Sequence, residues 1–190
     1  MVKKNVCFSH TCVNYSSCYE CPSSCSLGMH CGNQRIQNRE WKNLLVFKDN
    51  QKGLGLKALS LILKGDLIVE YTGLAVSDKS LIDVDPDRQH YLMLWYGAVL
   101  LNADVFGSVA RYINHSCDPN SMIQVWVSNG IKRNCVIALR NINEFEEITY
   151  DYNWTTAFAE RREKCNCLSK ICRGYIQCYH EPRKAKQSFD

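Results

Sequence analysis

The positions of the cysteines along the sequence strongly restrict the folds that this chain can adopt. Six of the twelve cysteines lie within residues 7–31 and four within residues 165–178, so only Cys117 and Cys135 lie between the two clusters. Residues 1–41 are also rich in Ser and Asn and poor in aliphatic side chains, which is typical of loops that metal ions hold together. We therefore expect a central domain with a cysteine-bound module at each end.

The choice between zinc and disulfides depends on the cellular compartment. Residues 1–7 carry positive charge but not the apolar segment of a secretory signal, so we expect a cytosolic or nuclear protein. Disulfides are rare in those compartments, and clustered cysteines there favour zinc. Disulfides are the alternative, with some support from glycosylation-like triplets that begin at Asn14, Asn114 and Asn153. No run of residues approaches the roughly 20 apolar residues of a membrane span, so we expect no membrane association.

Residues 42–153 carry the expected core of a single domain. Short runs rich in β-branched and aromatic residues predict strands at 44–47, 66–71, 99–101, 122–127, 135–139 and 147–150. Turn sequences at 64–66, 118–120 and 128–130 separate several of them. Two short helices are predicted, at 107–112 and 155–163. The pattern indicates a mostly-β fold with few helices.

The C-terminal cysteines have the spacing of a metal site. Cys165, Cys167 and Cys172 form a C-x-C-x4-C cluster that supplies three thiolates, whereas a structural zinc site needs four ligands. Cys178 is the local candidate for the fourth ligand. Cys117 is the distant candidate, and its use would tie the C-terminal segment to residues 111–120.

In their order along the chain, the sequence motifs resemble those of the SET-domain protein lysine methyltransferases. The motifs are Gly-x-Gly at 53–55, Glu-Tyr-x-Gly at 70–73, His-Tyr at 90–91, Asn-His-Ser-Cys-Asp-Pro-Asn at 114–120, Thr-Tyr-Asp-Tyr at 149–152 and the C-x-C-x4-C cluster. Upstream, residues 21–37 look like the end of the AWS zinc module, which marks the subgroup acting on lysine 36 of histone H3. The resemblance covers residues 7–178. It implies a SET-type β-clip fold with a pseudoknot and flanking zinc-bound loops.

The resemblance also implies a division of the chain and a set of metal ligands. The expected parts are an AWS-like zinc module at 1–41, a SET domain at 42–153, a post-SET zinc module at 161–178 and a basic disordered tail at 179–190. One Zn²⁺ would be held by Cys117, Cys165, Cys167 and Cys172, and another by Cys7, Cys21, Cys25 and Cys31. A second N-terminal Zn²⁺ would require Cys12 together with Cys18 or His10, because the sequence lacks the first two cysteines of the module's pattern.

The implied methyl donor is S-adenosylmethionine. Its binding residues, by resemblance, would be Lys52, Gly53, Leu54, His90, Tyr91, Asn114 and His115, with the backbone of Asn166 closing over the adenine. Tyr152 is the implied catalytic residue, because its hydroxyl would orient the methyl group and the amine. Tyr150 would share a strand face with Tyr152. A Tyr rather than a Phe at position 150 leaves less room for a methylated amine, so we expect mono- or dimethylation.

The implied substrate is a histone lysine, with lysine 36 of histone H3 as the first expectation. The protein would act as a monomer on nucleosomes in the nucleus. Residues 160–190 hold eight Lys or Arg against four Asp or Glu, and this basic strip suits nucleosomal DNA. Leu74 and Asn102 replace acidic residues that are frequent in the family, which bears on substrate positioning. The alternatives are an enzyme acting on a non-histone lysine and an inactive SET module that binds chromatin.

Overall fold

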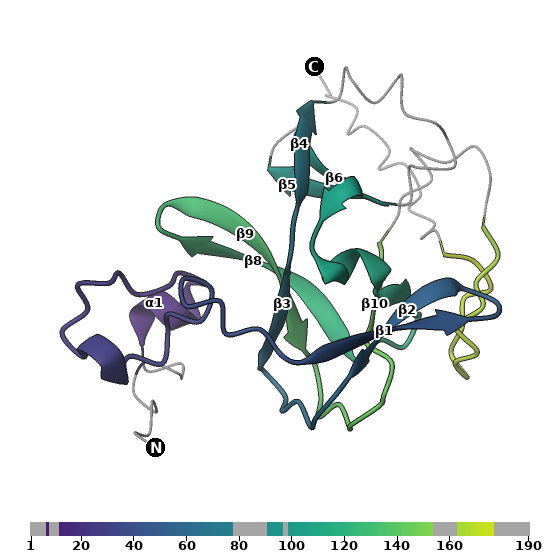
Figure 1. The fold of residues 1–190 in the computed structure, drawn as a ribbon, viewed down its shortest axis with the longest axis horizontal. Coiled ribbons are helices and arrows are strands. Elements are labelled where there is room, and N and C mark those ends of the chain that lie inside the picture. Colours follow the sequence, from purple (N-terminus) through teal and green to yellow (C-terminus); the bar gives the residue numbers. More distant parts are fainter. Residues whose placement is uncertain (1–6, 8–11, 78–90, 97–98, 154–162, 177–190) are drawn as a thin grey trace, which may run out of the picture.

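Strands dominate the structure of this chain (Figure 1). The computed structural model describes residues 7, 12–77, 91–96, 99–153 and 163–176. The helical elements within these ranges are short: α1 (Val13–Ser16) and the 3₁₀ turns η1 (Gly28–His30) and η4 (Val109–Tyr112). The strands are β1 (Leu44–Asp49), β2 (Gly53–Ala58), β3 (Leu67–Tyr71), β4 (Gly73–Ser77), β5 (Leu92–Tyr96), β6 (Val99–Gly107), β7 (Asn114–His115), β8 (Ser121–Ser128), β9 (Ile131–Ala138) and β10 (Thr149–Tyr150). The prediction of a mostly-β fold is confirmed.

The strands form four small sheets. β1 and β2 make an antiparallel hairpin, β3 pairs with β9 in the order β3-β9-β8, and β6 lies between β4 and β5. The fourth sheet is the parallel pair of β7 and β10. Only one residue, Thr72, separates β3 from β4, so a single extended segment passes from one three-stranded sheet to the other (Figure 1).

The parallel pair of β7 and β10 joins segments that are far apart in the sequence. Asn114 lies opposite Thr149 and His115 lies opposite Tyr150. The Asn120 side chain supports this crossing, because its Nδ2 donates to the Glu147 carbonyl oxygen at 2.8 Å and its Oδ1 accepts from the Thr149 N–H at 2.9 Å. Asn120 is 2% exposed, so its amide satisfies backbone groups that would otherwise be buried without partners.

The main core lies between these sheets and supports the β7–β10 crossing. Its largest fully buried side chains are Leu56, Ile62, Ile68, Ile113, Val136, Ile142 and Ile148. Tyr71 and Tyr150 are also buried in this cluster, and Tyr91 and Tyr152 pack against it. The core therefore ends in a group of aromatic side chains beside the paired strands.

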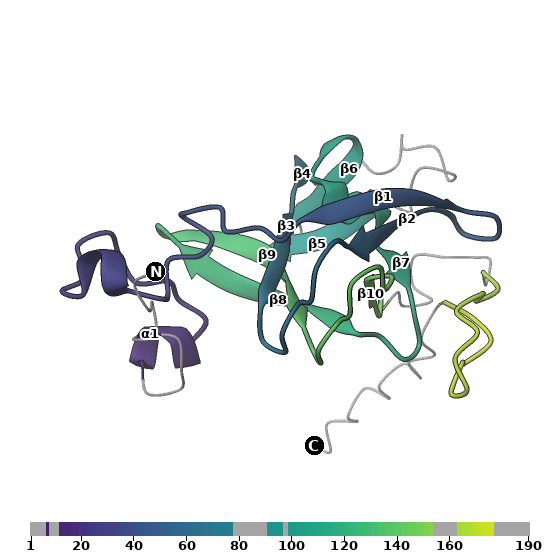
Figure 2. The same cartoon turned by 60° about the horizontal axis from the view of Figure 1, so that its bottom comes forward.

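The N-terminal module packs on the tip of the β8–β9 hairpin, and both ribbon views show this arrangement (Figures 1 and 2). The buried carboxylate of Glu20 accepts hydrogen bonds from the backbone N–H groups of Ile36 and Gln37 and from Ser128 Oγ, the last at 2.7 Å. The Arg35 guanidinium carbon lies 5.6 Å from the centroid of the Trp126 ring. A buried carboxylate with three donors and a cation on an indole thus hold the module against the hairpin.

The structure departs from the sequence predictions in several elements. The predicted strand at 147–150 is reduced to β10, and the predicted helix at 107–112 is the single 3₁₀ turn η4. Four strands, β2, β4, β5 and β7, were not predicted. Most of the expected helix at 155–163, and all of the expected tail at 179–190, lie outside the described residues. Among the helices that the structure describes, none has the length and hydropathy needed to cross a bilayer.

Candidate active site and cysteine clusters

Two groups of four cysteines are brought together within the described ranges. The first is Cys7, Cys21, Cys25 and Cys31, and the second is Cys117, Cys165, Cys167 and Cys172. In each group all four sulfur atoms lie within 4.8 Å of one another. Tetrahedral zinc with Zn–S bonds of about 2.3 Å separates its sulfur atoms by roughly 3.8 Å. The donor set and spacing fit zinc, and each cluster could hold one ion.

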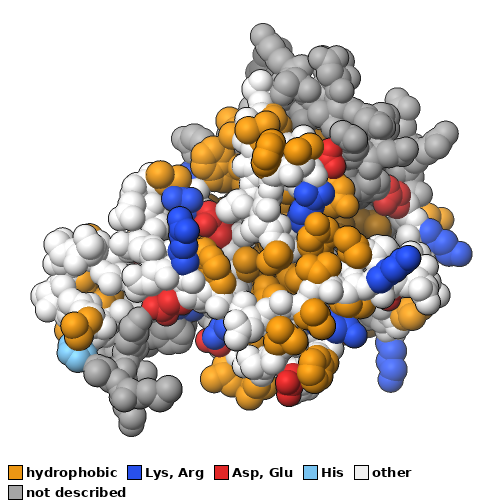
Figure 3. Space-filling model, viewed as in Figure 1, with side chains coloured by type: hydrophobic (Ala, Val, Ile, Leu, Met, Phe, Trp, Pro, Cys, Tyr) orange, Lys and Arg blue, Asp and Glu red, His pale blue; other side chains and the backbone are white. Residues whose placement is uncertain are grey.

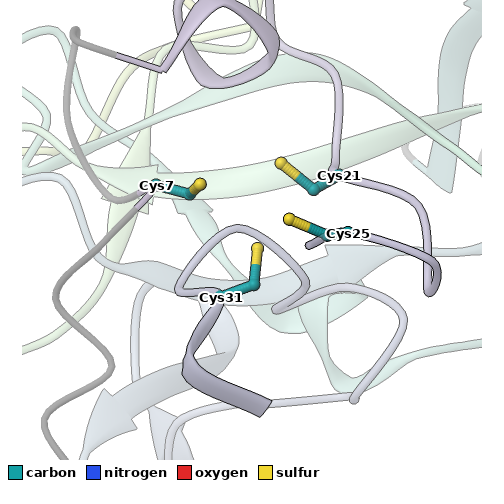
Figure 4. A group of neighbouring side chains, drawn as sticks. All are labelled: Cys7, Cys21, Cys25 and Cys31. Atoms are coloured by element: carbon teal, nitrogen blue, oxygen red, sulfur yellow. The ribbon is translucent and has the colours of Figure 1, made fainter. Parts of the chain in front are cut away.

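The N-terminal cluster directs its four thiols toward a common centre (Figure 4). Burial raises the pKa of the Cys21 thiol, but hydrogen bonds from the Asn14 and Asn33 side chains outweigh that effect and lower the pKa to about 7. A thiol with this pKa is readily deprotonated, which metal binding requires. Cys12 lies outside the group of four, although its Sγ is 3.8 Å from Cys21 Sγ.

Of the additional ligands considered for a second N-terminal zinc ion, Cys18 makes a contact elsewhere. The Cys18 thiol faces β8, where it accepts a hydrogen bond from Gln124 Nε2 at 3.3 Å. His10 lies outside the described residues. The second N-terminal ion therefore stays a prediction from the sequence.

The C-terminal cluster joins the loop after β7 to the chain end. Cys117 Sγ lies 3.8 Å from Cys165 Sγ and 3.4 Å from the Arg173 backbone N–H that donates to it. The Arg173 guanidinium also makes a two-pronged ion pair with Asp151, at 2.6 and 2.9 Å. Cys117 thus occupies the fourth position of this cluster, while Cys178 lies outside the described residues.

Four tyrosines meet next to the paired strands β7 and β10. The ring centroids of Tyr150 and Tyr152 are 4.9 Å apart, and the Tyr71 hydroxyl donates to the Tyr91 carbonyl oxygen at 3.1 Å. Burial raises the pKa values of Tyr71, Tyr150 and Tyr152 above the ordinary range, so all three hydroxyls are neutral at physiological pH. The Tyr152 hydroxyl donates to the Ile113 carbonyl oxygen at 2.8 Å, so the phenol is the donor in this contact.

His115 connects the tyrosines to the C-terminal cysteine cluster. Its Nδ1 accepts the Tyr152 backbone N–H at 3.2 Å, and its Nε2 lies 3.4 Å from Cys117 Sγ. The imidazole also packs edge-on against the Tyr152 ring, with centroids 5.3 Å apart. Burial lowers the pKa of His115 to about 4, so the ring is neutral near pH 7. The imidazole therefore bridges the segment after β10, which carries Tyr152, and the loop that carries Cys117.

The predicted donor residues at 52–54 lie where β1 turns into β2. Gly53 has φ +82°, a conformation that favours glycine, and Leu54 is exposed. Asn114 approaches this turn from β7, since its Nδ2 donates to the Leu54 carbonyl oxygen at 3.2 Å. The turn at 52–54 and the strand that carries Asn114 and His115 therefore line one region of the molecule.

For the remaining predicted donor residues within the described ranges, the contacts do not reach the turn at 52–54. Tyr91 is half-buried, and the Arg111 guanidinium carbon lies 4.5 Å from the centroid of its ring. Asn166 is exposed between Cys165 and Cys167. His90 lies outside the described residues.

Two groups of contacts near the site were not predicted from the sequence. Glu147 contacts both Lys52 and Asn114, and Asp151 pairs with Arg173. A Lys and a Glu 95 residues apart carry no pattern that marks them as partners. The only available signal was that Asp151 belongs to the Thr-Tyr-Asp-Tyr motif and that Glu147 lies two residues before it.

Comparison with known proteins agrees with this architecture. Residues 53–153 match the model of the SET domain family, which is more than half of the chain. The chain is 35% identical over 171 residues to histone-lysine N-methyltransferase Set2 of Drosophila melanogaster, covering 87% of this chain and 7% of that protein. It is 36% identical over 173 residues to the H3 lysine-36 specific histone-lysine N-methyltransferase of Candida glabrata, covering 87% and 24%.

A solved structure has the same fold. The crystal structure of KRYPTONITE in complex with mCHG DNA and SAH aligns with a TM-score of 0.71 and 29% identity, covering 83% of this chain and 34% of that chain. The chain belongs to the SET-domain family. It is homologous to histone H3 lysine-36 methyltransferases, and its two cysteine clusters fit the AWS and post-SET modules. The chain spans about a quarter or less of the length of these two methyltransferase relatives.

Proposed function

We propose that this chain is an S-adenosylmethionine-dependent protein-lysine N-methyltransferase that modifies histone H3, with lysine 36 as its first target. The family match and the names of the relatives support the activity and the substrate class. The main structural support is the place of Tyr152, whose phenol lies among other tyrosines and next to the strand that carries Asn114 and His115.

The tyrosine cluster suits transfer of a methyl group to an amine. S-adenosylmethionine, when bound, supplies an electrophilic methyl group, and the attacking lysine must be neutral. A buried aromatic environment disfavours the ammonium form and so lowers the pKa of a lysine that enters it. Because the Tyr152 hydroxyl is anchored to the Ile113 carbonyl, its oxygen can accept a hydrogen bond from the amine and orient it.

We assign the donor site to Lys52, Gly53, Leu54, His90, Tyr91, Asn114, His115 and Asn166. Tyr150 would limit the product, since its hydroxyl takes up room next to Tyr152 that a methylated amine would need. We therefore propose mono- or dimethylation. In each four-cysteine cluster we propose one structural Zn²⁺, which would hold the chain ends against the SET domain.

The proposed partners are the histone H3 tail and nucleosomal DNA, with the protein acting as a monomer in the nucleus. Lys164 and Lys170 of the basic strip are exposed and free to approach phosphates. Salt should weaken activity on nucleosomes more than on a free H3 peptide, because only the nucleosome offers those phosphates. Equal salt sensitivity on both substrates would exclude the DNA contact.

Methylation of nucleosomes, histone octamers and a total lysate with labelled donor tests the proposal. Mass spectrometry of the products then reports the modified lysine and its methyl count. We expect one or two methyl groups on H3 lysine 36, and a large loss of product with Tyr152→Phe. Labelling of lysate proteins alone would indicate a non-histone substrate, and no labelling anywhere would indicate a SET module that only binds chromatin.

A further inference from the structure

We propose that Glu147 is a positioning residue for the methyl-donor site. Its carboxylate holds Lys52 and Asn114, which approach the site from the β1–β2 turn and from β7. The inference rests on the proposed function, because that function assigns these two residues to the donor site. Glu147 itself would not contact the reacting atoms.

The contacts of Glu147 divide between its two carboxylate oxygens. Oε2 accepts from Lys52 Nζ at 2.5 Å, and Oε1 accepts from Asn114 Nδ2 at 2.8 Å. The side chains of Lys52 and Glu147 are 20% and 22% exposed, so this ion pair is shielded from most of the solvent. The Glu147 carboxylate therefore links the β1–β2 turn to β7. In the described sheets these two segments are not paired with each other through their backbones.

The hydrogen bond to Glu147 also determines how Asn114 is oriented. The Asn114 amide nitrogen has two hydrogens, and its two acceptors are Glu147 Oε1 and the Leu54 carbonyl oxygen at 3.2 Å. Since both acceptors lack hydrogens to donate, the amide nitrogen must face them. Asn114 is then left with its amide oxygen, which can only accept. It would suit an ammonium or amine N–H on the bound donor molecule.

The backbone of Glu147 is well placed to hold this arrangement. The Asn120 side chain donates to the Glu147 carbonyl oxygen at 2.8 Å, and the next residue, Ile148, donates its N–H to the Leu56 carbonyl oxygen at 2.8 Å. The backbone of Glu147 also forms an isolated antiparallel β-bridge with that of Lys57 in β2. The carboxylate thus projects from a segment fixed on two sides, so its position does not depend on a ligand.

Gly55 of β2 lies close to the Asn114 amide nitrogen and to the Phe47 ring. A Cβ atom added at Gly55 would lie 2.5 Å from Phe47 Cε1 and 3.0 Å from Asn114 Nδ2, so no side chain fits between the ring and the amide. The Asn114 amide nitrogen is therefore held by β2, through the Leu54 carbonyl and the close approach of Gly55, and by the Glu147 carboxylate. We infer that the donor site is organised before the donor binds, and that Glu147 provides the charged part of that organisation.

Binding of S-adenosylhomocysteine to the full chain, measured by calorimetry, tests the proposal without relying on turnover. Glu147→Gln keeps an acceptor for Asn114 and loses the charge that pairs with Lys52, whereas Glu147→Ala loses both. We expect the Kd to rise about threefold for Gln and about tenfold or more for Ala, because a charge-assisted hydrogen bond is worth more than a neutral one. The KM for S-adenosylmethionine should rise in parallel, with kcat at saturating donor changed less than about twofold.

Glu146→Gln is the matched control. Glu146 is the neighbouring carboxylate, and its side chain contacts Arg140 at 2.7 Å, the Asn143 N–H at 3.0 Å and Asn120 at 2.9 Å. None of these three residues is assigned to the donor site, and glutamine keeps an acceptor for Asn120, so the hydrogen bond from Asn120 to the Glu147 carbonyl is retained. We expect this control to lower the melting temperature and to leave the Kd for S-adenosylhomocysteine unchanged.

Three outcomes would overturn the inference: an unchanged Kd in both Glu147 variants, an equal loss of binding in Glu146→Gln, or a fall in kcat alone. If Glu147→Ala does not fold, the comparison of the two Gln variants decides the matter. Failure of the wild-type chain to bind S-adenosylhomocysteine would instead contradict the proposed function.

Discussion

At the scale of single residues, the protonation state of Tyr152 distinguishes two possible roles of its phenol, which are to orient the substrate amine or to remove a proton from it. Burial raises its pKa above the ordinary value of 10, so the hydroxyl stays protonated below that pH and cannot be a base at neutral pH. The hydrogen bond to the Ile113 carbonyl is consistent with the protonated form. The structure thus favours Tyr152 as a residue that orients the amine over one that removes its proton.

The first prediction concerns Tyr152→Phe and the pH dependence of the rate. We expect kcat to fall at least about 100-fold, a typical loss for a positioned catalytic group, while binding of S-adenosylhomocysteine is retained. The rise of the residual rate with pH should keep the midpoint of the wild type, since it reports the lysine amine. A midpoint below pH 10 that disappears in the variant would show that Tyr152 itself titrates.

The second prediction concerns Tyr150→Phe. Tyr150 is buried against Tyr152, so removal of its hydroxyl enlarges the space next to the amine by about one oxygen atom. We expect the product to shift from mono- and dimethyllysine toward trimethyllysine, as measured by mass spectrometry at long reaction times. An unchanged distribution of methyl states would mean that Tyr150 does not set the limit.

At the scale of the elements, an ion pair joins the Thr-Tyr-Asp-Tyr segment to the C-terminal cluster, in addition to the contacts of His115. Arg173 binds Asp151 through both terminal nitrogens, and its backbone N–H donates to Cys117 Sγ. The Arg173 side chain is about one-third exposed, so solvent weakens the pair, although its two-pronged geometry favours it.

The third prediction is that Arg173→Met releases the metal of the C-terminal cluster faster. We expect zinc to pass to a coloured chelator about fivefold faster from that cluster, because the segment loses a charge-assisted contact to the core. The N-terminal cluster should release its zinc at the wild-type rate. Lys170→Met, an exposed position in the same segment, is the control and should leave both rates unchanged.

The sequence was a good guide to the elements whose residues have strong intrinsic preferences. The β-branched runs in 66–71, 122–127 and 135–139 are contained in or overlap β3, β8 and β9. β2 and β7 were missed because Gly-Leu-Gly and Asn-His have low strand propensity, and tertiary pairing places them in sheets. β2 is paired with the adjacent strand β1, whereas β7 is paired with β10, which lies far along the chain and leaves no local signal for the pairing.

The candidate site was predictable to the extent that its residues lie within motifs. The resemblance to a known family placed Cys117 with the C-terminal cysteines and Tyr150 beside Tyr152, and the structure brings both sets together. Glu147 was missed because its role consists of contacts with Lys52 and Asn114, which are 95 and 33 residues away. Its own neighbourhood in the sequence holds no sign of either contact.

At the scale of the whole molecule, exposed hydrophobic side chains lie on the face shown in Figure 3, including those over β4 and β6. Among the described residues before position 42, the buried hydrophobic ones are Cys21, Cys31 and Ile36. Most of the buried hydrophobic residues belong instead to the segment from Leu56 to Tyr150. Folding of the ends should therefore depend on metal, while folding of the central sheets should not.

The fourth prediction concerns the different dependence of the two cysteine clusters and the central sheets on metal. Metal analysis of the purified chain should find zinc in both clusters, and Cys25→Ser and Cys172→Ser should each remove about one ion per chain. A strong chelator should abolish methyl transfer while most of the strand signal in circular dichroism survives. Cooperative loss of all secondary structure on chelation would mean that the central sheets also require the metal.

The strand β8 is fastened at both of its ends. Ser121 Oγ donates to the Thr149 carbonyl oxygen next to Tyr150, and Ser128 Oγ donates to the Glu20 carboxylate in the N-terminal module. Seven steps of an extended strand span about 24 Å. β8 therefore fixes the distance between the N-terminal module and the tyrosine cluster. If the N-terminal module docks on a binding partner, we expect that only lysines at that distance from the docking point can reach the Tyr152 hydroxyl.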